Sequence, residues 1–170
     1  LAYDPALGTV LNAGDDQTLN VTFTPDDPAN FNTSNTSVTI DVAKADPMLS
    51  WNDPATIAFG TELNSAQLNA TAGVPGSFVY NPVAGTILDV GNDQVLNTTF
   101  TPSDGANYNP ASASVTIDVI KADPTVTWDN PAGIAVGVPL GATQLNATAE
   151  VDGTFVYNPA AGTTLSAGEN

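Results

Sequence analysis

Residues 115–124 read Val-Thr-Ile-Asp-Val-Ile-Lys-Ala-Asp-Pro, and residues 38–47 repeat this stretch with Ala43 in place of Ile120. Apolar and polar side chains alternate through its first five positions, which is the pattern of a β-strand with one buried face. The stretch ends in Asp-Pro, and proline lacks the backbone donor that a strand interior needs. It therefore predicts a strand followed by a linker, at two places in the chain.

A period of 77 residues runs through the whole chain. Aligning 44–93 with 121–170 gives 29 identities in 50 positions, and aligning 1–43 with 78–120 gives 24 in 43. No insertion or deletion separates the copies. A repeat of this kind is typical of a tandem array in which each copy is one folding unit.

We place the repeat boundaries in the Asp-Pro linkers. Residues 44–120 then form one complete repeat, residues 1–43 the C-terminal part of a preceding repeat, and residues 121–170 the N-terminal part of the following repeat. Because the chain begins and ends inside a repeat, we expect it to be an excerpt of a longer array.

The strand pattern predicts an all-β protein. No window shows helical periodicity, while short alternating stretches and turn residues recur about every 8–12 positions. Leu96 and Phe100 share one face of such a stretch, and Asn97 and Thr99 lie on the other. About seven short strands in 77 residues, with Cys absent, are typical of an immunoglobulin-like sandwich that has no disulfide. We therefore expect tandem immunoglobulin-like β-sandwiches.

Turn chemistry adds a more local prediction. Residues 74–76 are Val-Pro-Gly and residues 151–153 are Val-Asp-Gly, and both triplets contain a reverse-turn pair. We therefore expect 67–72 and 77–81 to form a hairpin. The aromatic side chains expected in the core are Trp51, Phe78, Trp128 and Phe155.

Composition excludes several functions. The chain of 170 residues has 2 Lys+Arg against 18 Asp+Glu, a formal net charge of −16. Such a chain repels phosphate backbones, so we predict no nucleic-acid binding. No apolar stretch is long enough for direct membrane insertion. The absence of His and Cys removes the usual transition-metal ligands and His-assisted nucleophiles.

Paired carboxylates are the remaining catalytic candidate. A glycosidase needs two carboxyl groups about 5–10 Å apart in a cleft. Asp15-Asp16 and Asp26-Asp27 each lose one member in the next copy, where Asn92 and Ser103 stand. We therefore predict that the protein is not an enzyme and has no catalytic or cofactor-binding residues.

Aspartates near the expected joints suggest weak calcium binding. Calcium takes 6–8 oxygen ligands. No spacing resembles an EF-hand loop, and the alternative is that these aspartates face solvent or begin turns before proline. The candidate ligands are Asp41, Asp46, Asp118 and Asp123, with Asp53 and Asp129 nearby.

Two further features of the surface have more than one interpretation. Lys44 and Lys121 lie at the joints, either as exposed linker residues or as donors of a Lys–Asn isopeptide bond. Asn-x-Ser/Thr sequons are glycosylation candidates, although a surface rich in Asn and Thr also produces them by chance. The sequons begin at Asn20, Asn32, Asn35, Asn69, Asn97 and Asn146.

Three motifs resemble a known family. They are Lys-Ala-Asp-Pro-x-x-x-Trp at 44–51, Gln-Leu-Asn-Ala-Thr-Ala-x-Val-x-Gly-x-Phe-Val-Tyr-Asn-Pro at 67–82, and Leu-Asn-x-Thr-Phe-Thr-Pro-x-Asp-x-Ala-Asn-(Phe/Tyr)-Asn at 96–109. Together they resemble the tandem bacterial immunoglobulin-like repeats of large secreted and surface-anchored proteins. The resemblance implies a β-sandwich in a stalk, spacer or adhesin, without a catalytic site.

We therefore expect a structural repeat of an extracellular or cell-surface stalk, adhesin or filament. Its partners would be neighbouring repeats of the same chain or identical chains in a fibre. The alternative is a β-sandwich module that binds carbohydrate or a cell surface. A binding module would carry unusual loop residues in one copy, whereas these copies keep their loop length and loop chemistry.

Overall fold

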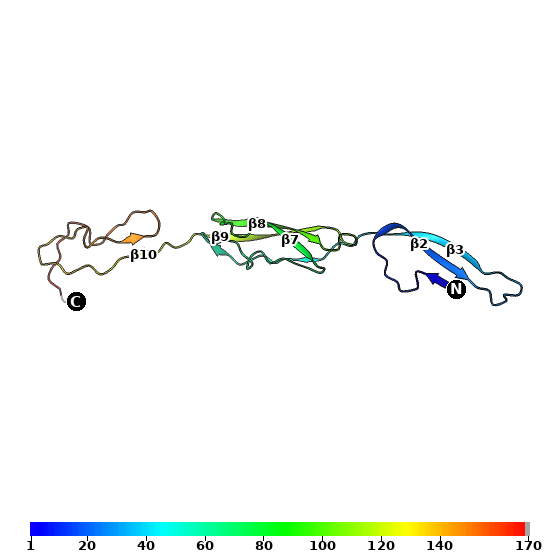
Figure 1. The fold of residues 1–170 in the computed structure, drawn as a ribbon. Coiled ribbons are helices and arrows are strands. Elements are labelled where there is room, and N and C mark those ends of the chain that lie inside the picture. The colour runs from blue at the N-terminus through cyan, green and yellow to red at the C-terminus, as the bar shows by residue number, and fades with distance from the viewer. Residues whose placement is uncertain (169–170) are drawn as a thin grey trace. The chain divides into compact units, whose positions relative to one another are not determined.

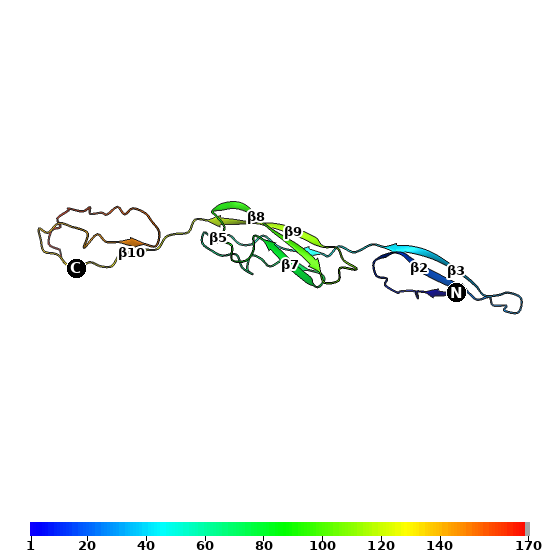
Figure 2. The ribbon, with the colours of Figure 1, turned by 45° about the horizontal axis from the view of Figure 1, so that its top comes forward.

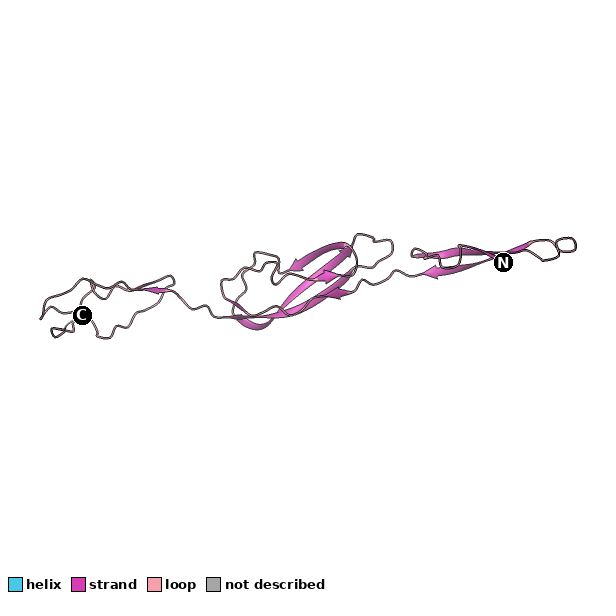
Figure 3. Ribbon diagram, turned by 90° about the horizontal axis from the view of Figure 1, so that it is seen from below, coloured by secondary structure: helices cyan, strands magenta, loops and turns pink. Residues whose placement is uncertain are grey.

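The structure is a computed structural model that describes residues 1–168, and it confirms the all-β class. Figures 1 and 3 show strands and connecting loops. Within the described residues there is no helix, and hence none that is long and apolar enough to cross a membrane. The chain forms two compact units, Leu1–Lys121 and Ala122–Asn170.

The first sheet of unit 1 is made by the N-terminal residues. Its strands are β1 (Ala2–Asp4), β2 (Gly14–Phe23) and β3 (Ser34–Val42), antiparallel and in the order β1-β2-β3. The alternation of β3 places Val38 and Ile40 on one face, as predicted. However, these side chains are 63% and 44% exposed, so the apolar face forms without being covered.

Residues 44–120 contain two more sheets. Figure 2 shows the larger one, in which β5 pairs in parallel with β9 and the other pairs are antiparallel. Its order is β5 (Ile57–Ala58), β9 (Ala111–Ile120), β8 (Gly91–Pro102), β7 (Gly76–Asn81). The smaller sheet pairs β4 (Leu49–Ser50) with β6 (Thr71–Ala72).

The core lies on one face of the four-stranded sheet. Leu96 and Phe100 of β8 are buried, while Asn97 and Thr99 between them are exposed, so the alternation predicted for this strand is confirmed. Ile117 of β9 joins the same core. The covering side chains come from the segment between β5 and β6, and they include Leu63 and Leu68.

The predicted hairpin across residues 74–76 is wrong. β6 pairs with β4, and β7 pairs with β8, so this turn carries the chain from one sheet to the other. Gly76 at the end of this turn allows the backbone to approach the Phe100 ring closely. A Cβ on Gly76 would lie 2.3 Å from Cζ of Phe100, too close for any other residue to fit without a shift. The Pro-Gly pair predicts a turn, but the close approach of backbone to ring that requires glycine here depends on a contact between distant segments.

Unit 2 contains a single two-stranded sheet among its described residues. It pairs β10 (Val126–Thr127) with β11 (Thr148–Ala149). Leu140 is buried, but Trp128 is 50% and Phe155 41% exposed, so the prediction that both aromatic side chains are core residues is wrong here. The physical reason is that the described residues of unit 2 hold no counterparts of β8 and β9, the strands on which Trp51 and Phe78 pack.

Trp51 and Phe78 of the complete repeat are half-buried, less than predicted. The Trp51 ring meets Tyr80 edge to face at 5.4 Å between centroids, and Nε1 of Trp51 donates a hydrogen bond to O of Gln67 at 3.0 Å. A tryptophan that must satisfy its N–H is often placed at the border of a core. Trp51 therefore closes the edge of this core rather than filling its centre.

Candidate functional site

The loop between β8 and β9, residues 103–110, binds the linker at the start of the same repeat, residues 44–46. The amide of Ala45 donates to O of Asn107, and the amide of Asn109 donates back to O of Ala45, both at 2.9 Å. Nδ2 of Asn109 also donates to Oδ1 of Asp46 at 2.8 Å. The linker is thus held by backbone and side chain together.

Asn107 extends this network to the preceding repeat. Its Oδ1 accepts a hydrogen bond from the amide of Ala13 at 2.8 Å, and its Nδ2 lies 3.3 Å from Oδ1 of Asn12. The same Nδ2 donates to Oδ2 of Asp104 at 2.8 Å, which fixes the orientation of the amide. We call Asn12, Ala13, the linker 44–46 and the loop 103–110 the repeat joint.

Lys44 is the only lysine of the repeat joint. It is exposed, and its Nζ donates to O of Gly105 at 2.5 Å. Pro47, three residues on, is buried. This is the arrangement of an exposed linker lysine, which agrees with the first of the two interpretations. An isopeptide bond would instead need a buried lysine close to an asparagine.

The Asp104 carboxyl has a lowered pKa. The main cause is the hydrogen bond from the Asn107 side chain, and the positive charge of Lys44 adds a smaller effect. At the equivalent loop of the preceding repeat, the Asn30 side chain lowers the pKa of Asp27 in the same way. Both carboxyls are fully exposed, so these shifts describe local loop structure and not a buried catalytic group.

Two of the predicted calcium ligands close β-bulges. Oδ1 of Asp41 accepts from the amide of Asp16 at 2.8 Å, and Oδ1 of Asp118 accepts from the amide of Asp93 at 2.9 Å. Asp16 and Asp93 have φ of 50° and 52°, where side chains other than glycine are strained. The carboxylates therefore stabilise an unfavourable backbone. Sequence reasoning missed this role, although both copies carry Gly-x-Asp-Gln at the bulge.

Two of the remaining aspartates also accept hydrogen bonds from nearby groups. Asp46 accepts from Asn109, and Oδ1 of Asp53 accepts from the amide of Thr116 at 3.0 Å. Asp123 and Asp129 are exposed. Across residues 1–168, no three Asp, Glu, His or Cys side chains gather into a group that could hold a metal ion. Calcium binding at the joints stays a prediction.

The sequon asparagines all lie on the surface. Asn20, Asn35 and Asn97 stand on strands β2, β3 and β8, and the other three lie in loops. All six are exposed: Asn20, Asn32, Asn35, Asn69, Asn97 and Asn146. Their positions would accept a glycan without disturbing the core, and glycosylation itself stays a prediction.

A polar groove of about 410 Å³ beside Trp51 is the feature closest to a carbohydrate-binding site. Such a site would use the aromatic ring together with free polar groups. Here Nε1 of Trp51 is bound to Gln67, and Oδ1 of Asp53 is bound to the amide of Thr116. Two of the groups that would recognise a sugar are therefore already used within the protein.

Comparison with known proteins finds no match among protein-family models, curated proteins or solved structures. The resemblance to bacterial immunoglobulin-like repeats stays an expectation drawn from three motifs.

Proposed function

We propose that the protein is a structural repeat of an extracellular or cell-surface stalk, adhesin or filament, built from immunoglobulin-like sandwiches. The observation that carries the proposal is the repeat joint. Asn107 binds the preceding repeat while the backbone beside it binds the linker. Contacts on both sides of a linker restrict the angle between the two repeats that it joins. A spacer needs such a restricted angle, whereas an independent binding module does not.

The sandwich part of the proposal is supported by the complete repeat. Its four-stranded sheet and its β4–β6 pair belong to one stretch of chain, 44–120, and the buried side chains gather on one face of the larger sheet. A mostly antiparallel sheet with one buried face is the expected state of one layer of a small sandwich.

The surface supports a location outside the cell. The net charge of −16 and the exposed Asn and Thr side chains favour solubility and keep neighbouring fibres apart. The protein has no Cys, so hydrogen bonds and packing take the place of disulfides in holding the repeats.

Asn107→Ala tests the structural proposal. Because the protein has no native Cys, spin labels can be placed at Ser37→Cys and Ser114→Cys, equivalent exposed positions of β3 and β9. The labelled 170-residue chain is diluted into unlabelled protein, and the distance distribution is measured by electron spin resonance. We expect a narrow distribution that broadens at least twofold in the Asn107→Ala variant.

Asn30→Ala is the matched control. Asn30 makes the same bond to Asp27 that Asn107 makes to Asp104, but within residues 1–168 its hydrogen bonds stay inside its own loop. The control should leave the distribution narrow. A distribution that is already broad in the unmodified chain would contradict the proposal of a restricted joint.

A further inference from the structure

The basic side chains of the chain lie in its linkers. Among the 170 residues the only Lys or Arg are Lys44 and Lys121, at equivalent positions 77 residues apart. A protease that cleaves after a basic residue therefore has one target bond per repeat, the bond between the lysine and the alanine that follows it. Cleavage at this bond would separate repeats and leave the strands of each repeat in one piece.

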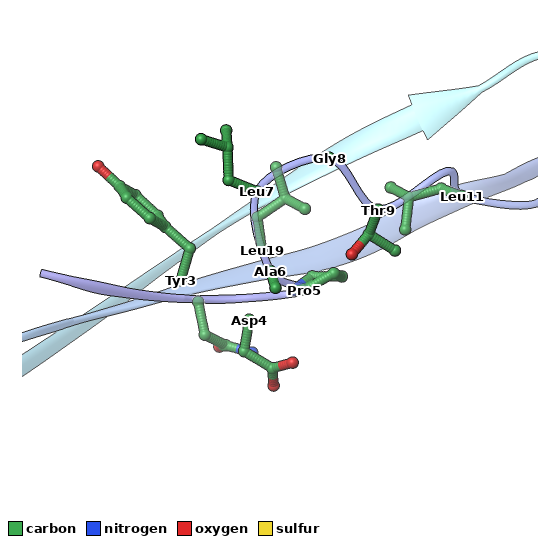
Figure 4. Close-up of a pocket in the computed structure, with 10 residues that line it drawn as sticks. Tyr3, Asp4, Pro5, Ala6, Leu7, Gly8, Thr9, Leu11 and Leu19 are labelled. Atoms are coloured by element: carbon green, nitrogen blue, oxygen red, sulfur yellow. The ribbon is translucent and has the colours of Figure 1, made fainter.

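Exposed loops elsewhere do not offer such a target. Loops of this kind are the usual sites of proteolytic cleavage. The loop between β1 and β2 is one of them, with Leu7 96% exposed. Figure 4 shows this loop beside an apolar groove of about 400 Å³, lined by Tyr3, Leu11 and Leu19 among others. The loop contains no Lys or Arg, so a protease of this class finds no target in it.

The linker around Lys44 is exposed, but its backbone is not free. Lys44, Ala45 and Asp46 all lie on the surface, so burial does not protect the Lys44–Ala45 bond. The amide of Ala45, which is the nitrogen of that bond, donates to O of Asn107, and O of Ala45 accepts from the amide of Asn109. A protease that binds its substrate as an added strand needs these same backbone groups. It cannot bind the linker while the loop does.

The side chains beside the target bond are held as well. Nζ of Lys44 donates to O of Gly105. A protease that cleaves after lysine binds the ammonium group in its own specificity pocket, so Nζ must first leave Gly105. On the other side of the bond, Asp46 accepts from Nδ2 of Asn109 at 2.8 Å, and Pro47 is buried. Both flanks of the bond are therefore fixed to the complete repeat.

We propose that the Lys44–Ala45 bond is a cleavage site for a protease that cleaves after lysine, and that the repeat joint controls access to it. In the closed joint the bond is paired and resists cleavage. When the loop 103–110 releases the linker, water adds across the bond. The C–N bond breaks, Lys44 keeps a carboxylate, and Ala45 gains a free amino group. The inference goes beyond the proposed function, because it needs only contacts inside the complete repeat.

Opening of the linker does not require unfolding of the repeat. The contacts described above between linker and loop are four hydrogen bonds at the surface. The core is made by other segments, among them Leu63, Leu96 and Ile117. Segments with few buried apolar contacts open locally more often than a whole domain unfolds. Cleavage should therefore follow the opening of the joint and not the stability of the core.

Trypsin digestion of the Lys121→Gln chain tests the proposal, because this chain has one target bond left. The rate is measured by mass spectrometry from the appearance of fragments 1–44 and 45–170. Asn109→Ala removes the bond to Asp46, and we expect cleavage to accelerate about three- to tenfold, as for the loss of one hydrogen bond. Asn109→Pro also removes the amide that donates to Ala45, and should accelerate it further.

Two control variants carry the same Lys121→Gln change. Asn32→Ala alters the equivalent residue of the preceding repeat and should leave the rate unchanged. Ile117→Val removes one methylene group from the core, where Ile117 is 2% exposed. It should lower the stability measured in urea without changing the rate of cleavage. The indole N–H signal of Trp51, whose Nε1 binds O of Gln67, reports whether each variant keeps its core.

Two results would overturn the inference. One is an equal rate of cleavage for the unmodified linker and for Asn109→Pro with its core intact. The other is an acceleration by Ile117→Val as large as that by Asn109→Ala, which would show that cleavage follows unfolding of the repeat. Neither result bears on the angle between repeats, which is measured separately through the contact of Asn107 with Ala13.

Discussion

The β2–β3 and β8–β9 hairpins share their pairing but differ in burial. Leu19 pairs with Val38 as Leu96 pairs with Val115, and both hairpins have a register shift after the equivalent glycine. Leu96 is fully buried, whereas Leu19 lines an open groove. Strand pairing in these repeats is therefore set locally by the sequence of the hairpin, and burial is set by a segment from elsewhere.

The largest expected effect is a difference between the two hairpins in how much stability an alanine substitution removes. Leu96→Ala should lower the free energy of unfolding of the complete repeat by about 2–5 kcal/mol, because it opens a cavity in a closed core. Leu19→Ala in the dilute chain should cost less than about 1 kcal/mol. Urea unfolding followed through the indole fluorescence and hydrogen exchange in β8 and β2 measure both. Equal losses would show that the first sheet is covered in solution.

An intermediate effect concerns calcium at Asp46 and Asp123, which occupy the same position in two copies. A weak site with a millimolar Kd should add about 1 kcal/mol at about 5 mM calcium. Chelator should then lower the melting temperature, and Asp46→Asn with Asp123→Asn should abolish the difference. Scanning calorimetry in calcium and in chelator measures it. Identical melting in both would remove calcium from the joints.

The smallest expected effect is a change in the pKa of Asp104 that Asp27 does not share. Lys44→Met should raise the pKa of Asp104 toward its ordinary value of 3.8 and leave the pKa of Asp27 unchanged. Because the folded-state pKa of each carboxyl lies below its unfolded value, the loop contacts are present above pH 3.8 and are lost as the pH falls through the folded-state pKa. Carbon-13 NMR titration of both carboxyls measures the shift. A parallel change at Asp27 would contradict the local effect of Lys44.

The all-β class and the inward face of β8 and β9 followed from alternation, because burial in a strand has a period of two. Contacts between distant segments could not be predicted in the same way. The pairing of β6 with β4 depends on where two sheets meet, and the reach of Asn107 to Ala13 spans 94 residues. The aspartates at the bulges were noticed for their charge, but their task depends on the φ of a residue on the neighbouring strand.

The parallel pairing of β5 with β9 has a mechanical consequence. Ile57 pairs with Val119, and the amide of Phe59 donates to O of Ile120 at 2.8 Å, so this contact ties the early part of the repeat to its last strand. Tension applied through Lys44 and Lys121 runs along β9 and drags the two strands past each other. When the force runs parallel to two paired strands, their hydrogen bonds are sheared and must break together. When the force pulls the strands apart from one end, the hydrogen bonds break one after another. A pulled repeat would therefore resist at the short β5–β9 pair, whose hydrogen bonds are loaded in shear.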